Sequence, residues 1–288
     1  MEYILHILIF TAIYSIAGLG LNLLSGFTGL VSVAQGAFMG IGAYTVAILM
    51  TTLQLNFFIA LLIGVIITSL VAFMLGYVFS KLNGDYFVLG TIGFASLIYS
   101  MAQNLSSITR GPLGIPGIPS PTIFGINFGS NFSFFILALT MLAVCYGILH
   151  FITSNSFGRV LKAIREDEKA LQIFGYKTSH YKLIAFVLAG ALGAMSGGLL
   201  ASYLTFIDPA SFNLTLSVFI LTGIILGGLA SLPGTVAGVL ILVLVPEALR
   251  FVGFSSEIAG QMREMTYGLI LILFMMYRPK GIWGKYKI

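Results

Sequence analysis

The sequence predicts an all-α, polytopic integral membrane helical bundle. Of its 288 residues, 58% are hydrophobic and only 8% are charged, whereas ordinary soluble domains carry about 25% charged residues. A soluble domain needs polar side chains over its whole surface, so most of the surface of this chain must face something other than water. The lipid bilayer fits that requirement.

Long runs without charge support this interpretation. Segments 57–80, 183–207 and 209–246 contain no acidic or basic residue, and about 20 apolar residues cross the hydrocarbon core as a helix. We expect about nine transmembrane helices, in a range of about eight to ten, within a single domain covering 1–288. The spans are placed near 3–20, 31–51, 57–79, 86–104, 132–152, 183–204, 214–230, 235–250 and 265–277. Some of the last, Gly-rich spans are short and are expected to be broken or re-entrant.

Basic residues predict the orientation of the spans. They gather in two places, the 153–182 loop (Arg159, Lys162, Arg165, Lys169, Lys177, Lys182) and the C-terminal segment (Arg278, Lys280, Lys285, Lys287). Positively charged loops stay on the cytoplasmic side of a membrane, which places the N-terminus and the 105–131 loop outside. The net charge of +5 is therefore a topology signal and does not indicate nucleic-acid binding.

Glycines recur at four-residue spacing within several spans. The pairs are Gly36/Gly40, Gly193/Gly197, Gly223/Gly227 and Gly234/Gly238. Small residues at this spacing let membrane helices approach closely, so we expect most of them to serve helix packing. The alternative is that some lie beside a translocation path, where the backbone must slide or unwind.

The residues for catalysis by this chain are missing. Gly281–Tyr286 lacks the spacing of a nucleotide-binding P-loop, and Ser196, which lies among glycines, needs a histidine base that the sequence does not bring near it. The single cysteine, Cys145, permits neither an internal disulfide nor a zinc-finger type of site. We therefore expect no enzyme, no catalytic residue, no metal and no cofactor. Coupling to sodium through backbone carbonyls stays open.

The 153–182 loop contains an amphipathic helix. Ser154, Asn155 and Ser156 offer N-caps, and Gly175 is placed to end the helix. Apolar residues fall on one stripe, namely Phe157, Val160, Leu161, Ile164, Leu171 and Phe174. Such a helix either lies in the lipid interface or docks into a groove of a soluble partner. The mixed charges of 165–168 favour a protein partner, because a lipid surface prefers a uniformly basic face.

Five ordered segments resemble the LivM-type permeases of branched-chain amino acid ABC importers. The 158–168 stretch, followed by Ala170, Gly175 and 181–183, is similar to their cytoplasmic loop. The other matching segments are 20–29 with 35–38 and 40–44, Gly84–Phe87, Thr109–Pro112 with 114–115, and 226–234 near the end; 277–281 also fits. Departures are Arg110 where glycine is usual, Gln35 where histidine is common, and a weak form of the Glu-Ala-Ala pattern at 168–170.

The resemblance implies a multi-pass permease of a bacterial or archaeal plasma membrane. Its implied partners are a second, LivH-like permease, two cytoplasmic ATPases that use the ATP, and an extracytoplasmic solute-binding protein. The implied solutes are leucine, isoleucine and valine, although relatives carry urea, amides, nucleosides or sugars. An autonomous ion-coupled carrier is the competing class.

The resemblance also assigns candidate residues. The ATPase-coupling set is Arg159, Leu161, Ile164, Arg165, Glu166, Glu168, Leu171 and Gly175, with the apolar stripe expected in a groove of the ATPase and Arg165, Glu166 and Glu168 at its rim. The candidates for the translocation path are Asn22, Ser32, Gln35, Gly227, Gly228, Ser231 and Gly234. Interhelical hydrogen bonds alone are an equal alternative for the three polar residues near the first spans, and the glycines and Ser231 are expected to form a tight helix–turn–helix.

Overall fold

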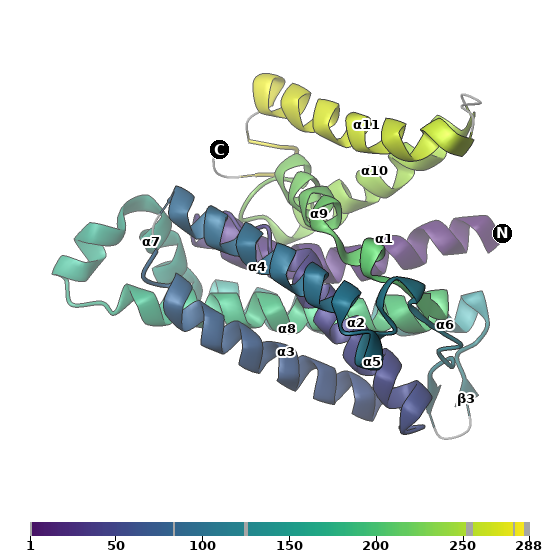
Figure 1. Cartoon of the computed structure of the whole chain (residues 1–288). Helices are drawn as coiled ribbons and strands as arrows, with labels where there is room; N and C mark the ends of the chain where they lie inside the picture. Colours follow the sequence, from purple (N-terminus) through teal and green to yellow (C-terminus); the bar gives the residue numbers. More distant parts are fainter. Residues whose placement is uncertain (1, 83, 124–125, 252–255, 279, 285–288) are drawn as a thin grey trace.

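The computed structural model describes all residues except 1, 83, 124–125, 252–255, 279 and 285–288, so the predicted topology signals Lys285 and Lys287 lie outside the described residues. The chain is a bundle of helices (Figure 1). The helices are α1 (Glu2–Leu21), α2 (Gln35–Thr52), α3 (Phe57–Phe79), α4 (Asp85–Asn104), α5 (Ser106–Thr109), α6 (Asn131–Ser154), α7 (Ser156–Ile173), α8 (Thr178–Leu204), α9 (Leu214–Gly227), α10 (Leu232–Phe251) and α11 (Ser256–Tyr277).

Short elements join these helices. A π-helical turn, η1 (Asn22–Phe27), continues α1, and two 3-10 turns, η2 (Gly111–Leu113) and η3 (Pro209–Phe212), lie in loops. Strand β1 (Ile115–Pro116) pairs antiparallel with β4 (Phe206–Ile207). Strand β2 (Thr122–Ile123) pairs antiparallel with β3 (Ile126–Asn127).

The predicted fold class is confirmed, because each predicted span coincides with one of the long helices. Within the described residues, six helices are long and apolar enough to cross a membrane. Helix α9 has 14 residues and reaches spanning length only together with η3. Helix α10 has an apolar stretch over Leu232–Val245 and α11 has one over Met265–Phe274, both shorter than a usual span. The expectation of short segments near the end of the chain therefore holds.

Helix α8 lies at the centre of the bundle and packs against α1, α2 and α3. Glycine makes its contact with α2 possible: a Cβ added at Gly197 would lie 1.9 Å from the carbonyl oxygen of Met39. A Cβ at Gly42 would lie 2.4 Å from the Cα of Ala194. The two backbones therefore touch, which gains dispersion contacts that larger side chains would prevent. The packing role expected for Gly193 and Gly197 is confirmed.

The loops separate to two ends of the bundle. The β1–β4 pairing joins the segment after α4 to the segment after α8, and the N-terminus lies toward this end (Figure 1). Helix α7, which precedes α8, lies at the opposite end (Figure 1). The 105–131 and 153–182 loops are thus on opposite sides, as the basic residues predict.

Candidate coupling site and its link to the helix core

Helix α7 is kinked rather than continuous. Asp167 has non-helical torsions (φ −154°, ψ 99°), and its Oδ1 accepts a hydrogen bond of 3.0 Å from the backbone N–H of Ala170. This is the geometry of a helix N-cap, so a second short helical segment begins at the kink. The helix ends, as predicted, before Gly175, which adopts a left-handed conformation (φ +84°) that a residue with a Cβ rarely adopts.

The first half of α7 faces the core of this chain. Leu161 and Ile164 are 0% and 4% exposed and belong to a buried apolar cluster that includes Phe27, Leu149 and Leu232. The expectation that these two side chains insert into a partner is therefore wrong. The apolar stripe was identified correctly, but the chain itself covers its first half, since η1, the end of α6 and the start of α8 pack against α7.

Arg165 fixes α7 to the π-helical turn η1. Its guanidinium Nη1 donates a hydrogen bond to the carbonyl oxygen of Gly26, and the Nζ of Lys162 lies 5.4 Å from the ring centroid of Phe27. A carbonyl in a π-helical turn is available for such an external donor when its helical partner is lost. Arg165 was expected at the rim of a partner's groove, and this contact places it inside the permease instead.

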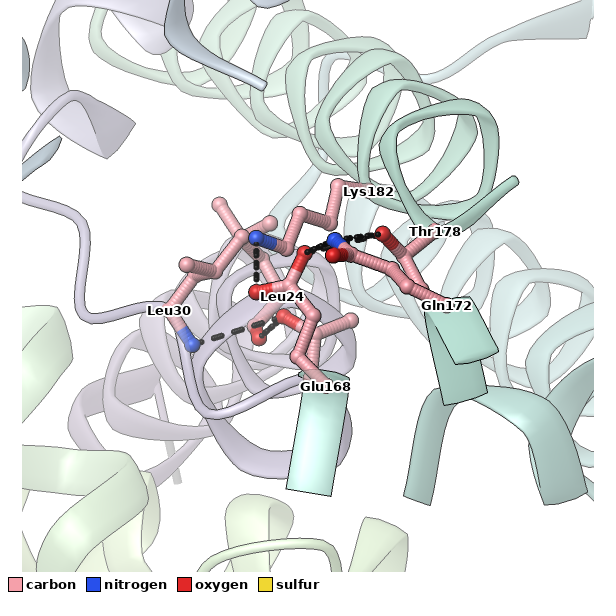
Figure 2. Close-up of polar contacts among 7 residues, drawn as sticks. Leu24, Leu30, Glu168, Gln172, Thr178 and Lys182 are labelled. Carbon is pink, nitrogen blue, oxygen red and sulfur yellow. Dashed lines mark hydrogen bonds and ion pairs between the residues drawn. The ribbon is translucent and has the colours of Figure 1, made fainter. Parts of the chain in front are cut away.

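Glu168 fixes the second half of α7 to the start of α8 (Figure 2). Its Oε2 lies 2.5 Å from the Nζ of Lys182, and its Oε1 accepts hydrogen bonds from Thr178 Oγ1 (2.9 Å) and Gln172 Nε2 (3.4 Å). The Lys182 side chain is 2% exposed and that of Glu168 is 23% exposed. A buried ammonium is strongly destabilising without a counter-charge, so Glu168 also acts within the chain.

The remaining coupling candidates lie on the outside of α7. Glu166 is exposed, and the guanidinium of exposed Arg159 donates to the Oγ of Ser156 over 2.7 Å. Leu171 is half-buried against the same apolar cluster. Beyond it, Ile173 and Phe174 are 85% and 80% exposed, which makes them the outermost apolar side chains of this loop.

Asn22 joins the end of α1 to the turn between α9 and α10. Its Nδ2 donates to the carbonyl oxygen of Ser231 (3.1 Å) and to Thr235 Oγ1 (2.6 Å). Its Oδ1 accepts a bond of 2.9 Å from the backbone N–H of Ala230. Asn22 is fully buried, and this set satisfies both ends of its amide, which removes most of the cost of burying it.

The α9–α10 turn is the tight helix–turn–helix that the sequence predicts. A Cβ at Gly227 would lie 1.9 Å from the carbonyl oxygen of Gly234, so the two backbones are in contact. Gly228 has φ +112°, and Ser231 Oγ accepts a 3.2 Å bond from the N–H of Gly234. The segment after α11 closes the turn, since Trp283 N–H donates to the Gly227 carbonyl over 3.0 Å.

Ser32 and Gln35 are buried and hydrogen-bonded within the chain. Gln35 Nε2 donates to the carbonyl oxygens of Ala17 (3.0 Å) and Ala189 (3.2 Å), bridging α1 and α8. Ser32 Oγ accepts a 3.3 Å bond from Ala34 N–H. The contacts of Gln35 agree with the interhelical alternative, whereas that of Ser32 is local, and the role of both in a path stays a prediction.

These contacts form one continuous connection from α7 to the membrane helices. Arg165 holds Gly26 in η1, the same turn begins with Asn22, and Asn22 holds Ala230, Ser231 and Thr235. Glu168 and Lys182 connect α7 to α8 in parallel. The roles of Gly26, Thr178 and Lys182 escaped the sequence analysis, which took Lys182 as a topology signal and as part of a segment shared with the LivM-type permeases. A lone lysine beginning a long apolar run was the available clue that it is buried with a partner.

Residues 3–277 match the family described as "Branched-chain amino acid transport system / permease component". The chain belongs to this permease family. It is 31% identical to the high-affinity branched-chain amino acid permease LivM of Salmonella typhimurium and 32% identical to LivM of Escherichia coli, over 94% of this chain and 68% of each relative. It is 25% identical to LivH of Salmonella typhimurium, over 94% of this chain and 91% of that protein. It is thus a polytopic permease of the plasma membrane.

Replacing Glu168 by Gln is expected to lower the thermal stability of the purified permease in detergent. Gln keeps the size and can still accept from Thr178, but it leaves the ammonium of Lys182 buried without a counter-charge, a change that costs about 3 kcal/mol. The matched control is Glu166→Gln on the exposed side of the same helix, which should melt like the wild type.

The double variant Glu168→Gln/Lys182→Met should recover most of the loss, because neither charge then remains buried. Equal melting temperatures for Glu168→Gln and Glu166→Gln would show that the ion pair does not hold α7.

Proposed function

We propose that this permease imports leucine, isoleucine and valine as one of two membrane subunits of an ATP-driven importer. The LivM and LivH relatives are permeases of high-affinity branched-chain amino acid transport systems, which supports the solute class. The observation that carries the mechanism is the connection from α7 through Gly26 and Asn22 to the α9–α10 turn. A force applied to α7 reaches two spans through hydrogen bonds, without a flexible intermediate.

The energy comes from two cytoplasmic ATPases that bind the α7 loop. In this proposal the anchors are Ile173 and Phe174, whose exposed apolar surfaces extend beyond the kink. Arg159 and Glu166, exposed on the first half of α7, carry opposite charges and orient the partner, as rim charges do. Leu161, Ile164, Arg165 and Glu168 then transmit the movement rather than make the contact.

The second permease subunit is a LivH-like protein, and an extracytoplasmic binding protein delivers the solute at the end that carries the β-strands. Orientation follows from the basic loops: the N-terminus is outside and the C-terminus is cytoplasmic. The permease contributes no ATPase activity of its own.

Orientation can be tested by cysteine labelling in the Cys145→Ala background, so that the introduced cysteine is the only thiol in the permease. Cys145 is buried, and alanine is a small apolar replacement for it. A cysteine at exposed Ser154 should react with a membrane-impermeant maleimide only in inverted vesicles. One at Ser120, on the opposite side of the bundle, should react only in whole cells. Labelling of both positions from the same side would contradict the proposed topology.

The double change Ile173→Ser/Phe174→Ser is expected to release the ATPases from the permease. Buried apolar anchors contribute about 2 kcal/mol or more to an interface, so affinity should fall about thirtyfold. The measurement is co-purification of the ATPases with the tagged permease pair. Leu113→Ser is the matched control, since Leu113 is 83% exposed at the opposite end. Retention of the ATPases by the double variant would favour a loop that lies on the lipid surface instead.

The solute is tested with radiolabelled leucine in proteoliposomes holding both permeases and the ATPases, with the binding protein added outside. We expect ATP-dependent uptake that isoleucine and valine inhibit and urea does not. The isolated permease should transport nothing. Uptake of urea without uptake of leucine would show that the chain belongs to a related importer for urea or amides. Uptake by the isolated permease, driven by an ion gradient, would show that it is an autonomous carrier.

A further inference from the structure

One stripe of the exposed surface of α4 consists of small and polar residues, beside exposed apolar side chains such as Leu89, Leu97 and Met101. Gly93, Ser96, Ser100 and Asn104 are all exposed, and their spacing of three and four residues places them on one side of the helix. Helix α4 is also the least apolar of the candidate spans. Hydroxyl and amide groups within spans commonly hydrogen-bond across helix contacts, so this stripe favours a protein or water-filled surrounding over lipid. This face of α4 is therefore placed to line a path.

A cavity of about 280 Å³ opens between this face of α4 and the start of α9. Its polar lining groups are Ser96, Tyr99, Ser100, Asn213 and Thr215. They supply hydroxyl and amide donors and acceptors, and none of the described residues that line the cavity carries a formal charge. Such a set can hydrogen-bond an ammonium and a carboxylate weakly enough to release them.

A second, apolar cavity of about 150 Å³ lies between α2, α4 and η3. Its wall includes Gly40, Ile41, Ile98, Ala102 and Phe212. A cavity of about this volume holds a molecule the size of benzene, which is larger than the side chain of leucine. Bulky apolar side chains beyond that size would not fit.

Tyr44 also lines the apolar cavity, and its hydroxyl is buried without a hydrogen-bond partner among the described residues. The residue is 7% exposed. A buried hydroxyl left unpaired destabilises a protein, so the Tyr44 hydroxyl is available to hydrogen-bond a ligand that binds transiently.

Tyr99 lies in the wall of both cavities. Its hydroxyl accepts a hydrogen bond of 2.7 Å from Gln103 Nε2. The two cavities are therefore neighbours.

We propose that the two cavities form one binding site on the translocation path for a branched aliphatic amino acid. The polar cavity takes the ammonium and carboxylate groups, and the apolar cavity takes the side chain, with the Tyr44 hydroxyl turned toward the passing polar groups. The inference rests on the proposed function and deepens it. The site lies in the half of α4 nearer the β-strand end, where the solute is delivered.

The test uses proteoliposomes with the complete importer and saturating loaded binding protein, so that binding-protein affinity does not enter. Ala102→Leu fills the apolar cavity. It should reduce the maximal rate for leucine and isoleucine about tenfold and that for the smaller valine clearly less, since one methylene in a filled pocket discriminates about tenfold or more. Tyr44→Phe keeps the packing, so it should leave the melting temperature unchanged and lower uptake of all three.

The control is Ala143→Leu, which adds the same volume on the exposed face of α6 and should transport like the wild type. A leucine-to-valine ratio unchanged by Ala102→Leu, or full transport by Tyr44→Phe, would overturn the site. If the importer with Ala102→Leu fails to assemble, the uptake measured with Tyr44→Phe still tests the proposed binding site. Failure of the wild-type importer to carry any of the three amino acids would instead refute the proposed function, and the site with it.

Discussion

The burial of Asn22 is the constraint on which the cytoplasmic half of this permease depends. The α9–α10 turn bends sharply within the protein and leaves backbone groups such as the N–H of Ala230 outside the helical hydrogen-bond pattern, whereas the carbonyl of Ser231 already accepts from the N–H of Thr235. In lipid or in a dry core each such group would be costly. The amide of Asn22 supplies a donor and an acceptor at once, which a hydroxyl or a carboxylate cannot do in the same geometry. The π-helical turn that follows Asn22 is held in place by the same contact.

The contact between Asn22 and the α9–α10 turn also requires that the backbones around it pack closely, and glycine allows this. Gly26 has no room for a side chain, since an added Cβ would lie 2.6 Å from the backbone nitrogen of Ala230. Gly227 and Gly234 bring α9 and α10 into backbone contact for the same reason. Where backbones touch, a displacement of one helix cannot be absorbed by side-chain rearrangement. The packing that stabilises the bundle therefore also makes it suited to transmitting movement from α7.

The sequence predicted most of the fold and less of the site. Long apolar runs identified the membrane-spanning helices, because hydrocarbon tolerates so few alternatives to an apolar helix. Four-residue glycine spacing identified glycines such as Gly197, Gly227 and Gly234 that lie at close helix contacts, but it did not show which helices they bring together. The amphipathic helix α7 was also found, but periodicity shows only that one face is apolar and does not show what covers it. Leu161 and Ile164 were therefore predicted to contact a partner, whereas Phe27 and Leu149 of the same chain cover them.

Glu168 near the end of α7 pairs with Lys182 near the start of α8. This pairing depends on how α8 turns back beneath α7, and no local sequence pattern contains that information.

The closure of α9 by Ile282 and Trp283 has a consequence for biosynthesis. The carbonyls of Leu226 and Gly227 receive hydrogen bonds from the N–H groups of Ile282 and Trp283, which follow α11 and lie 56 positions later in the chain. During synthesis at about 5–20 residues per second, α9 and α10 must enter the membrane and wait several seconds with these acceptors unpaired. The α9–α10 turn is thus among the last parts of the permease to reach its final structure, since it is completed only when the segment after α11 has emerged and folded back.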